Sequence, residues 1–276
     1  MNLNKKAIEY YPNKGKKSTK RILGISAHQD DLEIFGFYGI NKAIKEDYSF
    51  VGAVTSDGRN SPRTGEYANF TDQMMIEARI KEQEEASEIG HYEAQYLLGY
   101  QSSEIQQKEN DSIVNDFVEL IKFYKPEIIL THNLCDKHPT HVGTVIKVIK
   151  ALRQLDDEYM PKLILGCEVR RDLDWLNDKY KVILDCGEDA ELQKDLLTVF
   201  KSQVVGGKRY DLATVGRRYS NATFSASHGV DSYKMTNYAM DLTPLIKDKK
   251  LSIADFLEFY LDDFKREVLD LIKNTD

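Results

Sequence analysis

Side chains that can bind a metal or move a proton are concentrated in two short segments of the sequence. The first, AHQDD, occupies residues 27–31, and the second, THNLCDKHPTH, occupies residues 131–141. Together they hold four of the chain's six histidines and three aspartates. Two histidines and one carboxylate form a typical catalytic zinc site, with a further position left for water. The two segments therefore predict a metal centre that activates water for hydrolysis.

Neighbouring side chains within each segment are expected to divide the roles. Asp30 and Asp31 are adjacent, and successive side chains in a turn point in different directions, so one of them can bind the metal while the other faces the substrate as a general base. His138 and His141 stand three residues apart at the start of a predicted helix. They can supply one metal ligand and one hydrogen-bonding group. The alternative for the first segment alone is a helix N-cap, but the joint occurrence of both segments favours a site.

The elements that must position these side chains are two short apolar stretches at 21–27 and 127–131, which are typical of buried parallel strands. Open α/β sheets place their sites at the carboxyl ends of such strands, so the two segments are expected to meet. Further strands are predicted at 50–55, 94–99, 163–167 and 182–185, and helices at 32–45, 71–90, 111–124, 141–155, 190–205 and 211–224. This alternation predicts an α/β fold, a Rossmann-like layered sheet of mostly parallel strands flanked by helices.

The length of 276 residues fits one α/β domain. Because no linker or repeat divides the chain, we expect a single domain over 1–276, with a core at about 20–225 and a helical C-terminal elaboration at about 226–276. Residues 58–70 predict a long loop, of a kind that is uncommon unless it closes over something. A last helix begins after Ser252, and its apolar stripe can dock on the domain or on a second subunit. A homo-oligomer is therefore compatible with the sequence.

Composition and charge argue against several classes of protein. No apolar stretch approaches the ~18–20 residues of a membrane span, and the polar, Lys-rich residues 1–20 do not resemble a secretory signal. The net charge of -7 argues against nucleic acid as a partner, since phosphate binding needs a basic surface. Cys135, Cys167 and Cys186 are widely spaced and odd in number, which argues against disulfides or a thiolate zinc site and favours a cytoplasmic location.

With these motifs the sequence resembles the PIG-L (LmbE-like) family of zinc-dependent N-deacetylases. The family's hallmarks are an A-H-P-D-D segment at the end of the first strand and a later H-P-x-H segment. They stand here as AHQDD at 27–31 and HPTH at 138–141, with glutamine in place of the first proline. The resemblance extends over roughly residues 20–225. It implies an LmbE-like fold and hydrolysis of the N-acetyl group of an N-acetylglucosamine-type amino sugar or its conjugate.

The resemblance also implies roles for individual residues of the two segments. It implies one Zn²⁺ per chain, bound by His28, Asp31 and His141. Other divalent metals could occupy the same site. It makes Asp30 the general base. His138 would stabilise the tetrahedral oxyanion or protonate the leaving amine.

Three residues are candidates for contact with the substrate. Arg79 and Asp136 would contact it or orient the metal ligands, and the alternative for Arg79 is a surface ion pair with Glu82 on the same helix. Ser102 lies in a segment where the family often has a sugar-binding aspartate, which this sequence lacks. Sugar recognition would then use Ser102 or its neighbours, or the substrate differs.

Residues outside these sets are expected to be mainly structural. His132 is expected to pack or hydrogen-bond behind the site, and His228 lies outside both segments. Six aromatic residues near the predicted loops could stack on a sugar ring, although packing is their more frequent role: Tyr67, Phe70, Tyr210, Tyr219, Tyr233 and Tyr238.

Other functions are compatible with the same fold class. A nucleotide-binding protein would need a glycine-rich phosphate turn after the first strand, where this chain has two carboxylates that would repel a pyrophosphate. A metal-dependent hydrolase of another amide or ester, or a carbohydrate-binding relative without activity, would keep the same motifs. Metal content and amine release separate these alternatives.

Overall fold

The structure, a computed structural model, describes residues 1–225 and 228–275. Within these residues, eight strands form one sheet in the order β1-β4-β3-β2-β5-β6-β8-β7. The strands are β1 (Ile8–Tyr10), β2 (Arg21–Ser26), β3 (Ser49–Ser56), β4 (Ala94–Tyr100), β5 (Ile128–His132), β6 (Leu163–Cys167), β7 (Lys181–Asp185) and β8 (Thr236–Asp241).

The centre of the sheet is parallel and its edges are antiparallel. From β4 through β3, β2 and β5 to β6, each strand pairs in parallel with the next. β1 is antiparallel to β4, and β8 runs antiparallel between β6 and β7. The apolar sequences of β2 and β3 follow from this position, because parallel strands are covered on both faces.

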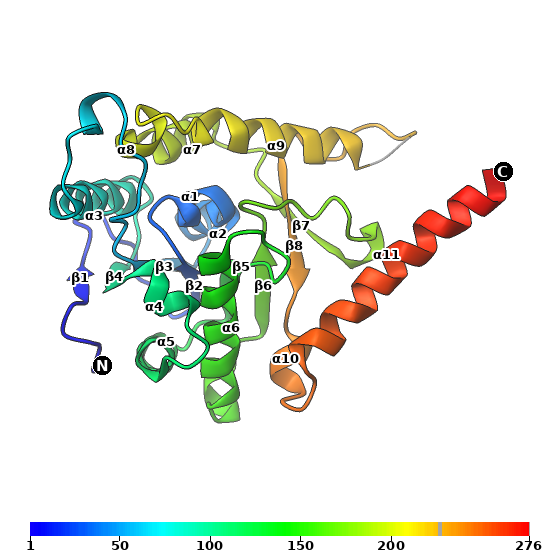
Figure 1. The fold of residues 1–276 in the computed structure, drawn as a ribbon, viewed down its shortest axis with the longest axis horizontal. Coiled ribbons are helices and arrows are strands. Elements are labelled where there is room, and N and C mark those ends of the chain that lie inside the picture. Colours follow the sequence, from blue (N-terminus) through cyan, green and yellow to red (C-terminus); the bar gives the residue numbers. More distant parts are fainter. Residues whose placement is uncertain (226–227, 276) are drawn as a thin grey trace.

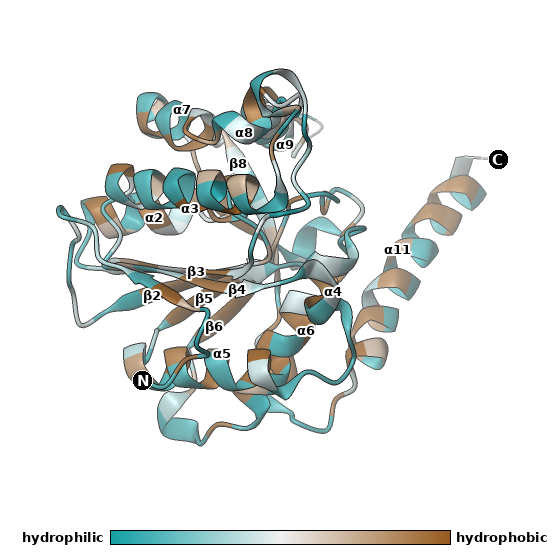
Figure 2. Ribbon diagram, turned by 60° about the vertical axis from the view of Figure 1, so that its left-hand side comes forward, coloured by the Kyte–Doolittle hydropathy of each residue, from teal (hydrophilic) through white to brown (hydrophobic). Residues whose placement is uncertain are grey.

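Helices cover both faces of the sheet, which gives three layers (Figures 1 and 2). They are α1 (Asp31–Phe35), α2 (Phe37–Lys45), α3 (Asp72–Ile89), α4 (Ser102–Gln106), α5 (Asp111–Tyr124), α6 (Pro139–Arg153), α7 (Ala190–Thr198), α8 (Lys201–Val204), α9 (Tyr210–Phe224), α10 (Pro244–Lys247) and α11 (Ile253–Thr275). Short 3-10 turns span Gly65–Tyr67, Asp157–Tyr159 and Asp178–Tyr180. In Figure 2, α2, α3 and α7 lie on one side of the sheet, and α5 and α6 lie on the other.

Each face of the sheet has its own apolar core. Ile129 of β5 packs with Phe117 of α5 and Val148 of α6 in one buried cluster. Phe35 of α1 and Phe50 of β3 belong to a second cluster that includes α2 and α7 residues. Burial on both faces fixes β2 and β5 side by side, so the segments that follow them are held at one edge of the sheet.

The structure confirms the predicted α/β fold and differs from it in detail. The helix predicted at 32–45 is divided at Gly36, whose N–H is bonded to the Leu32 carbonyl at the end of α1. The helix predicted at 190–205 is likewise two helices, α7 and α8.

The sheet extends beyond the predicted core of residues 20–225 at both ends. β1 precedes it, and β8 lies inside the segment expected to be a helical elaboration. Neither strand has a clear sequence signal, because β1 has three residues and β8 combines Thr236, Asn237 and Asp241 with apolar residues. Both are defined by pairing with strands distant in sequence, which local patterns do not report.

α11 leaves the body of the protein as a long arm (Figure 1). Its first half packs on the domain through Phe256 and through Tyr260, whose ring lies 5.0 Å from that of Tyr180. Its second half exposes apolar side chains such as Leu271 and Ile272. No helix in the described part of the chain is long and apolar enough to cross a membrane.

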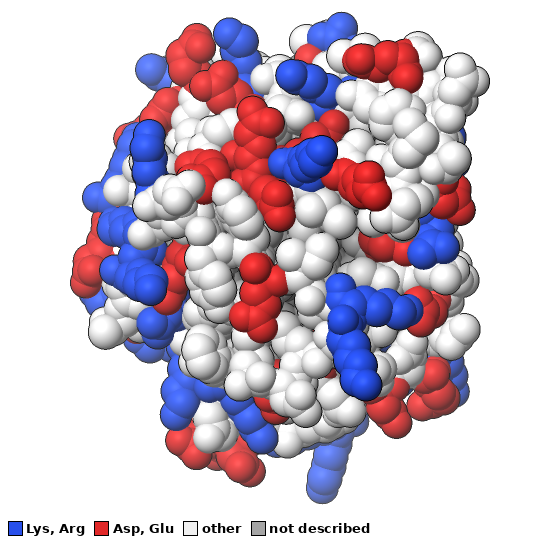
Figure 3. Space-filling model, turned by 90° about the vertical axis from the view of Figure 1, so that its left-hand side faces the viewer, with Lys and Arg blue, Asp and Glu red and all other residues white. Residues whose placement is uncertain are grey.

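Basic and acidic side chains are interspersed on the face that carries β1 and α3 (Figure 3).

Candidate active site

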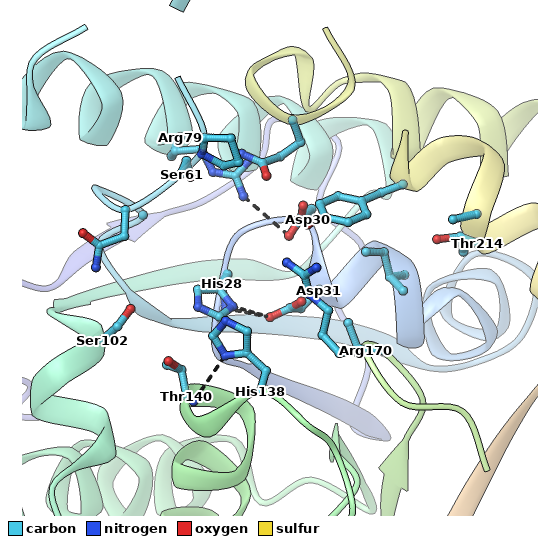
Figure 4. Close-up of a pocket in the computed structure, with 18 of the residues that line it drawn as sticks. His28, Asp30, Asp31, Ser61, Arg79, Ser102, His138, Thr140, Arg170 and Thr214 are labelled. Carbon is cyan, nitrogen blue, oxygen red and sulfur yellow. Dashed lines mark hydrogen bonds and ion pairs between the residues drawn. The ribbon is translucent and has the colours of Figure 1, made fainter. Parts of the chain in front are cut away.

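The two chemically rich segments meet at the carboxyl edge of the sheet, as expected from their positions after β2 and β5. They contribute to a cavity of about 290 Å³. Figure 4 shows His28, Asp30 and Asp31 at its centre, with His138 beside them. Three of the five residues singled out for the metal and for catalysis, His28, Asp31 and His141, point at one another. The other two, Asp30 and His138, line the cavity.

The turn after β2 separates the two aspartates. Asp30 has a φ of 87°, in the left-handed region that non-glycine residues seldom adopt. Asp31 begins α1, and its Oδ2 accepts a 2.8 Å hydrogen bond from the backbone N–H of His28. The Gln29 side chain donates to the Ser56 carbonyl at 3.1 Å and so ties the turn to β3. The strained turn therefore directs Asp31 toward His28 and leaves Asp30 for another role.

Three potential metal ligands converge on one point. His28 Nδ1 lies 3.2 Å from Asp31 Oδ2 and 3.1 Å from His141 Nε2, and His141 Nε2 lies 3.4 Å from Asp31 Oδ2. Tetrahedral zinc with bonds of about 2.0–2.1 Å would place its ligand atoms about 3.3–3.4 Å apart. The donor set and its spacing therefore fit a tetrahedral metal that keeps its fourth position open.

Asp136 stands behind this cluster. Its Oδ2 lies 3.2 Å from His141 Nδ1, the ring nitrogen that faces away from the donor cluster. Its Oδ1 accepts from the His138 N–H and its Oδ2 from the Arg170 N–H, both at 2.9 Å. Carboxylates in this position orient a metal-binding histidine and fix its tautomer. Since Asp136 does not line the cavity, the geometry favours the orienting role over substrate contact.

His132 is fully buried and stacks on His141, with ring centroids 4.0 Å apart. Its Nε2 lies 3.5 Å from Asp31 Oδ2, near enough for it to be considered a ligand. That nitrogen, however, accepts a 2.8 Å hydrogen bond from the Ala27 N–H, so its lone pair is already used. The geometry therefore agrees with the structural role expected for His132.

His138 is the N-cap of α6, and its Nδ1 accepts from the Thr140 N–H at 3.3 Å. Its Nε2 is consequently the protonated nitrogen of the neutral ring. Burial lowers the pKa of His138 to about 4, with nearby His28 and Arg170 adding to the effect. His138 lines the cavity, so this arrangement supplies a neutral N–H donor there.

Arg79 holds Asp30 from the α3 side. Its side chain is buried, and its Nη2 lies 3.5 Å from Asp30 Oδ1 and donates to the Gln29 carbonyl. Its Nη1 lies 3.2 Å from both Glu82 Oε2 and Ser202 Oγ. The ion pair with Glu82 is therefore present but buried, which corrects the alternative of a surface pair. Arg79 borders the cavity, yet most of its donors are bound within the protein.

Burial raises the pKa of Asp30 to about 7, against the opposing effect of Arg79. The side chain lines the cavity although the residue is only 6% exposed. A carboxylate that has lost most of its water is a stronger proton acceptor than a solvated one. Its position beside the three donor atoms suits it to accept a proton from water.

The remaining walls contain residues that the sequence analysis did not assign. Ser102 lines the cavity as predicted, and α9 contributes four residues from one helical face: Tyr210, Ala213, Thr214 and Arg217. Arg170, Gln203, Asn60 and Gln106 complete much of the polar lining. The spacing along α9 would have identified its inward face, but no pattern in the sequence indicates that this face meets residues 27–31.

The structure places one of the six aromatic candidates at the cavity and the others, with His228, away from it. Of the six aromatic residues considered for stacking on a sugar, only Tyr210 borders the cavity within the described residues. Tyr67 packs on Phe70, and Tyr238 belongs to the core. His228 is exposed and lies outside the cavity.

A family model described as "PIG-L: GlcNAc-PI de-N-acetylase" matches residues 23–152. This range runs from β2 through α6 and so contains the three converging donors, Asp30 and His138. Over this range the chain is similar to the PIG-L family. The match supports an enzyme of the deacetylase class of hydrolases. None of the curated protein sequences matches it.

Solved structures show the same fold around this site. N,N'-diacetylchitobiose deacetylase from Pyrococcus horikoshii has a TM-score of 0.67 at 16% identity, with 86% of this chain and 88% of that chain covered. GalB, the 4-carboxy-2-hydroxymuconate hydratase of Pseudomonas putida KT2440, has a TM-score of 0.62 at 16% identity, with 81% and 96% covered. The A40926 pseudoaglycone deacetylase Dbv21 has a TM-score of 0.57 at 14% identity, with 81% and 97% covered. The fold thus occurs in two deacetylases and a hydratase, so it does not by itself select a reaction.

Proposed function

We propose that this protein hydrolyses the N-acetyl group of an N-acetylglucosamine-type amino sugar or its conjugate. The observation that carries the proposal is the convergence of His28 Nδ1, Asp31 Oδ2 and His141 Nε2 beside the buried carboxyl of Asp30. The family match and the two deacetylases of the same fold support this reaction.

Zinc, one ion per chain, is the metal that a set of two histidines and one carboxylate favours, and other divalent metals fit the same ligands. When bound, it would polarise the amide carbonyl and lower the pKa of water. His28, Asp31 and His141 would hold it, with Asp136 keeping His141 in the tautomer that presents Nε2.

The chain's own residues supply the proton transfers. Asp30, held by Arg79, would take a proton from the attacking water. The Nε2–H of His138 would donate to the carbonyl oxygen as it becomes negative. The amide C–N bond then breaks as the proton returns from Asp30 to the nitrogen, so acetic acid and a free amine are formed, and the acetic acid gives its remaining proton to solvent to become acetate. Each proton and bond is thereby accounted for.

The cavity suits a small, polar substrate. Its volume of about 290 Å³ is at the lower end of ligand pockets, which span about 300–1,000 Å³. Asn60, Ser61, Ser102 and Gln106 offer hydrogen bonds to sugar hydroxyls along its walls. We infer a small-molecule amino sugar as the partner, with no role for nucleic acid.

Two further inferences concern the setting of the reaction. Cys135, Cys167 and Cys186 are free thiols, which supports a reducing compartment such as the cytoplasm. The exposed apolar side chains on the second half of α11 support self-association as a homo-oligomer.

The proposal is tested by metal analysis of the purified protein together with an amine-release assay. The panel should contain N-acetyl amino sugars, their glycosides, simple acyl amines and acetate esters. We expect one zinc per chain and release of free amine and acetate from at least one N-acetyl sugar. Hydrolysis of esters or simple amides alone would favour another hydrolase, and metal binding without turnover of any compound would favour a carbohydrate-binding relative.

A further inference from the structure

Two arginines of the cavity lie outside the segments that supply the metal ligands and the general base. Arg170 follows β6 and Arg217 lies on α9, and both side chains are half-buried. Both come after residue 152, where the family match ends, so the match assigns them no role. Among the described residues neither forms an ion pair within 4.0 Å, although Arg79 in the same cavity forms two. Guanidinium groups that face a cavity without a carboxylate partner indicate a negatively charged ligand.

The two arginines lie on the same part of the cavity wall. Arg217 Nη1 donates a 2.5 Å hydrogen bond to the carbonyl of Val169, the residue directly before Arg170. In Figure 4 the Arg170 side chain points into the cavity, toward the two aspartates of the site. Its guanidinium lies 4.9 Å from the ring centroid of Tyr210. Because a guanidinium has more N–H donors than one hydroxyl or one carbonyl can accept, donors of both arginines remain for a ligand.

The charge balance of the cavity favours an anion as that ligand. The charged side chains that line it are two carboxylates and three guanidinium groups. Asp30 lies 3.5 Å from Arg79, and Asp31 is one of the three converging metal donors. A bound divalent metal would increase the positive charge further. An excess of positive charge in one cavity of a protein with a net charge of -7 attracts anions from solution.

The direction of Arg170 limits where the substrate can carry its anionic group. The amide of the substrate must lie at the metal donors, so the sugar carbon that bears the amide nitrogen, C2, lies beside them. Arg170 points toward the same centre and can therefore reach groups on the neighbouring ring carbons, C1 and C3. C6 is attached to C5, which is opposite C2 in the sugar ring, so a group on C6 points away from this centre.

We propose that Arg170 and Arg217 form an anion subsite, which selects N-acetyl amino sugars that carry a phosphate or a carboxylate on C1 or C3. Guanidinium groups bind both anions through paired N–H donors, which gives direction as well as affinity. The subsite binds and orients the substrate and transfers no proton. The inference rests on the proposed amide hydrolysis and names the class of sugar on which the enzyme acts.

The first test compares kcat/KM of the zinc-loaded protein for charged and uncharged N-acetyl sugars. N-Acetylglucosamine 1-phosphate carries phosphate on C1, and N-acetylmuramic acid carries a carboxylate on C3, so the two compounds separate the two sources of charge. We expect at least one of them to exceed the uncharged methyl glycoside of N-acetylglucosamine by about 10- to 100-fold, the gain from hydrogen bonds to a charged group. N-Acetylglucosamine 6-phosphate should show no such gain.

The second test removes the charge of each arginine. Arg170→Gln and Arg217→Gln should each lower the ratio of kcat/KM for the preferred anionic sugar to that for the methyl glycoside by about 10-fold or more. Arg171→Gln is the matched control, because it removes the same charge beside Arg170 at an exposed position outside the cavity. The control should keep the native ratio.

Binding of the amine products provides a readout that does not depend on turnover. Calorimetry should show that the native protein binds glucosamine 1-phosphate or muramic acid more tightly than the methyl glycoside of glucosamine. This difference should shrink in Arg170→Gln and in Arg217→Gln and persist in Arg171→Gln. It should also decrease as the salt concentration rises, because salt screens the attraction between charges.

The outcomes separate this inference from the proposed function. If the native protein cleaves no N-acetyl compound, the proposed reaction fails, and calorimetry with the amine products still decides whether the anion subsite exists. In an active enzyme, equal or better turnover of the methyl glycoside overturns the inference, and so does an equal gain for the 6-phosphate. A preference for anionic sugars that persists in both arginine variants overturns it as well.

Discussion

At the scale of single residues, adjacent aspartates are given different environments by one strained turn. The left-handed backbone of Asp30 directs its carboxyl to Arg79, while Asp31 joins His28 and His141. Strained backbone is retained where surrounding contacts and function require it, and at Asp30 the strained turn separates two adjacent carboxylates.

Replacing Asp30 with asparagine tests its role as general base. Asparagine tolerates a left-handed backbone, so the turn at φ 87° should persist. General-base catalysis is worth about 100- to 10,000-fold, and we expect amine release to fall by that order while the protein still binds one metal. Native turnover in Asp30→Asn would refute the assignment, and loss of the metal would show that Asp30 is a ligand.

Replacing Asp136 with asparagine tests its role behind His141. An amide cannot stabilise the His141 tautomer as a carboxylate does, so metal affinity should fall by about 10- to 100-fold. Competition with a fluorescent zinc chelator measures this change. The control is Asp174→Asn, at an exposed position. If Asp136→Asn changes KM for the sugar but not metal affinity, substrate contact is its role instead.

At the scale of elements, the site depends on how closely α6 and α4 approach. α6 carries His138 at its N-cap and His141 in its first turn, and α4 begins at Ser102. Gly143 allows this approach, because a Cβ there would lie 2.5 Å from the backbone oxygen of Ile105 at the end of α4. The absence of a side chain at this position therefore lets α6 pack closely against α4.

Gly143→Ala should push α4 and α6 apart. We expect a loss of about 1–3 kcal/mol in the free energy of unfolding, together with reduced activity. Gly216→Ala on α9 is the matched control, because a Cβ there meets nothing within 4 Å. It should stabilise the protein by about 0.5–1 kcal/mol. Denaturant unfolding compares the two variants, and equal effects would show that the Ile105 contact is unimportant.

At the scale of the whole molecule, a bound metal would join distant parts of the chain. His28 and Asp31 follow β2, whereas His141 lies in α6, more than a hundred residues later in the sequence. A ligand that binds only the folded state stabilises it by mass action. Metal binding should therefore stabilise the fold as a whole.

Removing the metal with a chelator should lower the melting temperature, and zinc should restore it. At free zinc about 1,000 times its Kd the gain is about 4 kcal/mol. His141→Ala should lack this response, whereas His228→Ala, at an exposed position outside the cavity, should keep it. An unchanged melting temperature after complete metal removal would contradict a metal held between β2 and α6.

The sequence by itself determined the fold class, most of the elements and the two segments that carry the chemistry. These features are local: apolar stretches define buried strands, and metal ligands must lie close to the ends of such strands. The sequence did not reveal β8, whose place between β6 and β7 depends on pairing with distant strands. It also left Arg79 and Asp136 with open roles, because spacing along the chain does not show which atoms face one another.

Only the tertiary structure decided which side chains share the cavity. It placed Asp136 behind His141 and bound Arg79 to Asp30, Glu82 and Ser202. It brought α9, with Tyr210, against a turn nearly two hundred residues earlier in the sequence. Such contacts arise when whole helices pack on the sheet. The sequence around one residue does not show which distant residue this packing will bring into contact with it.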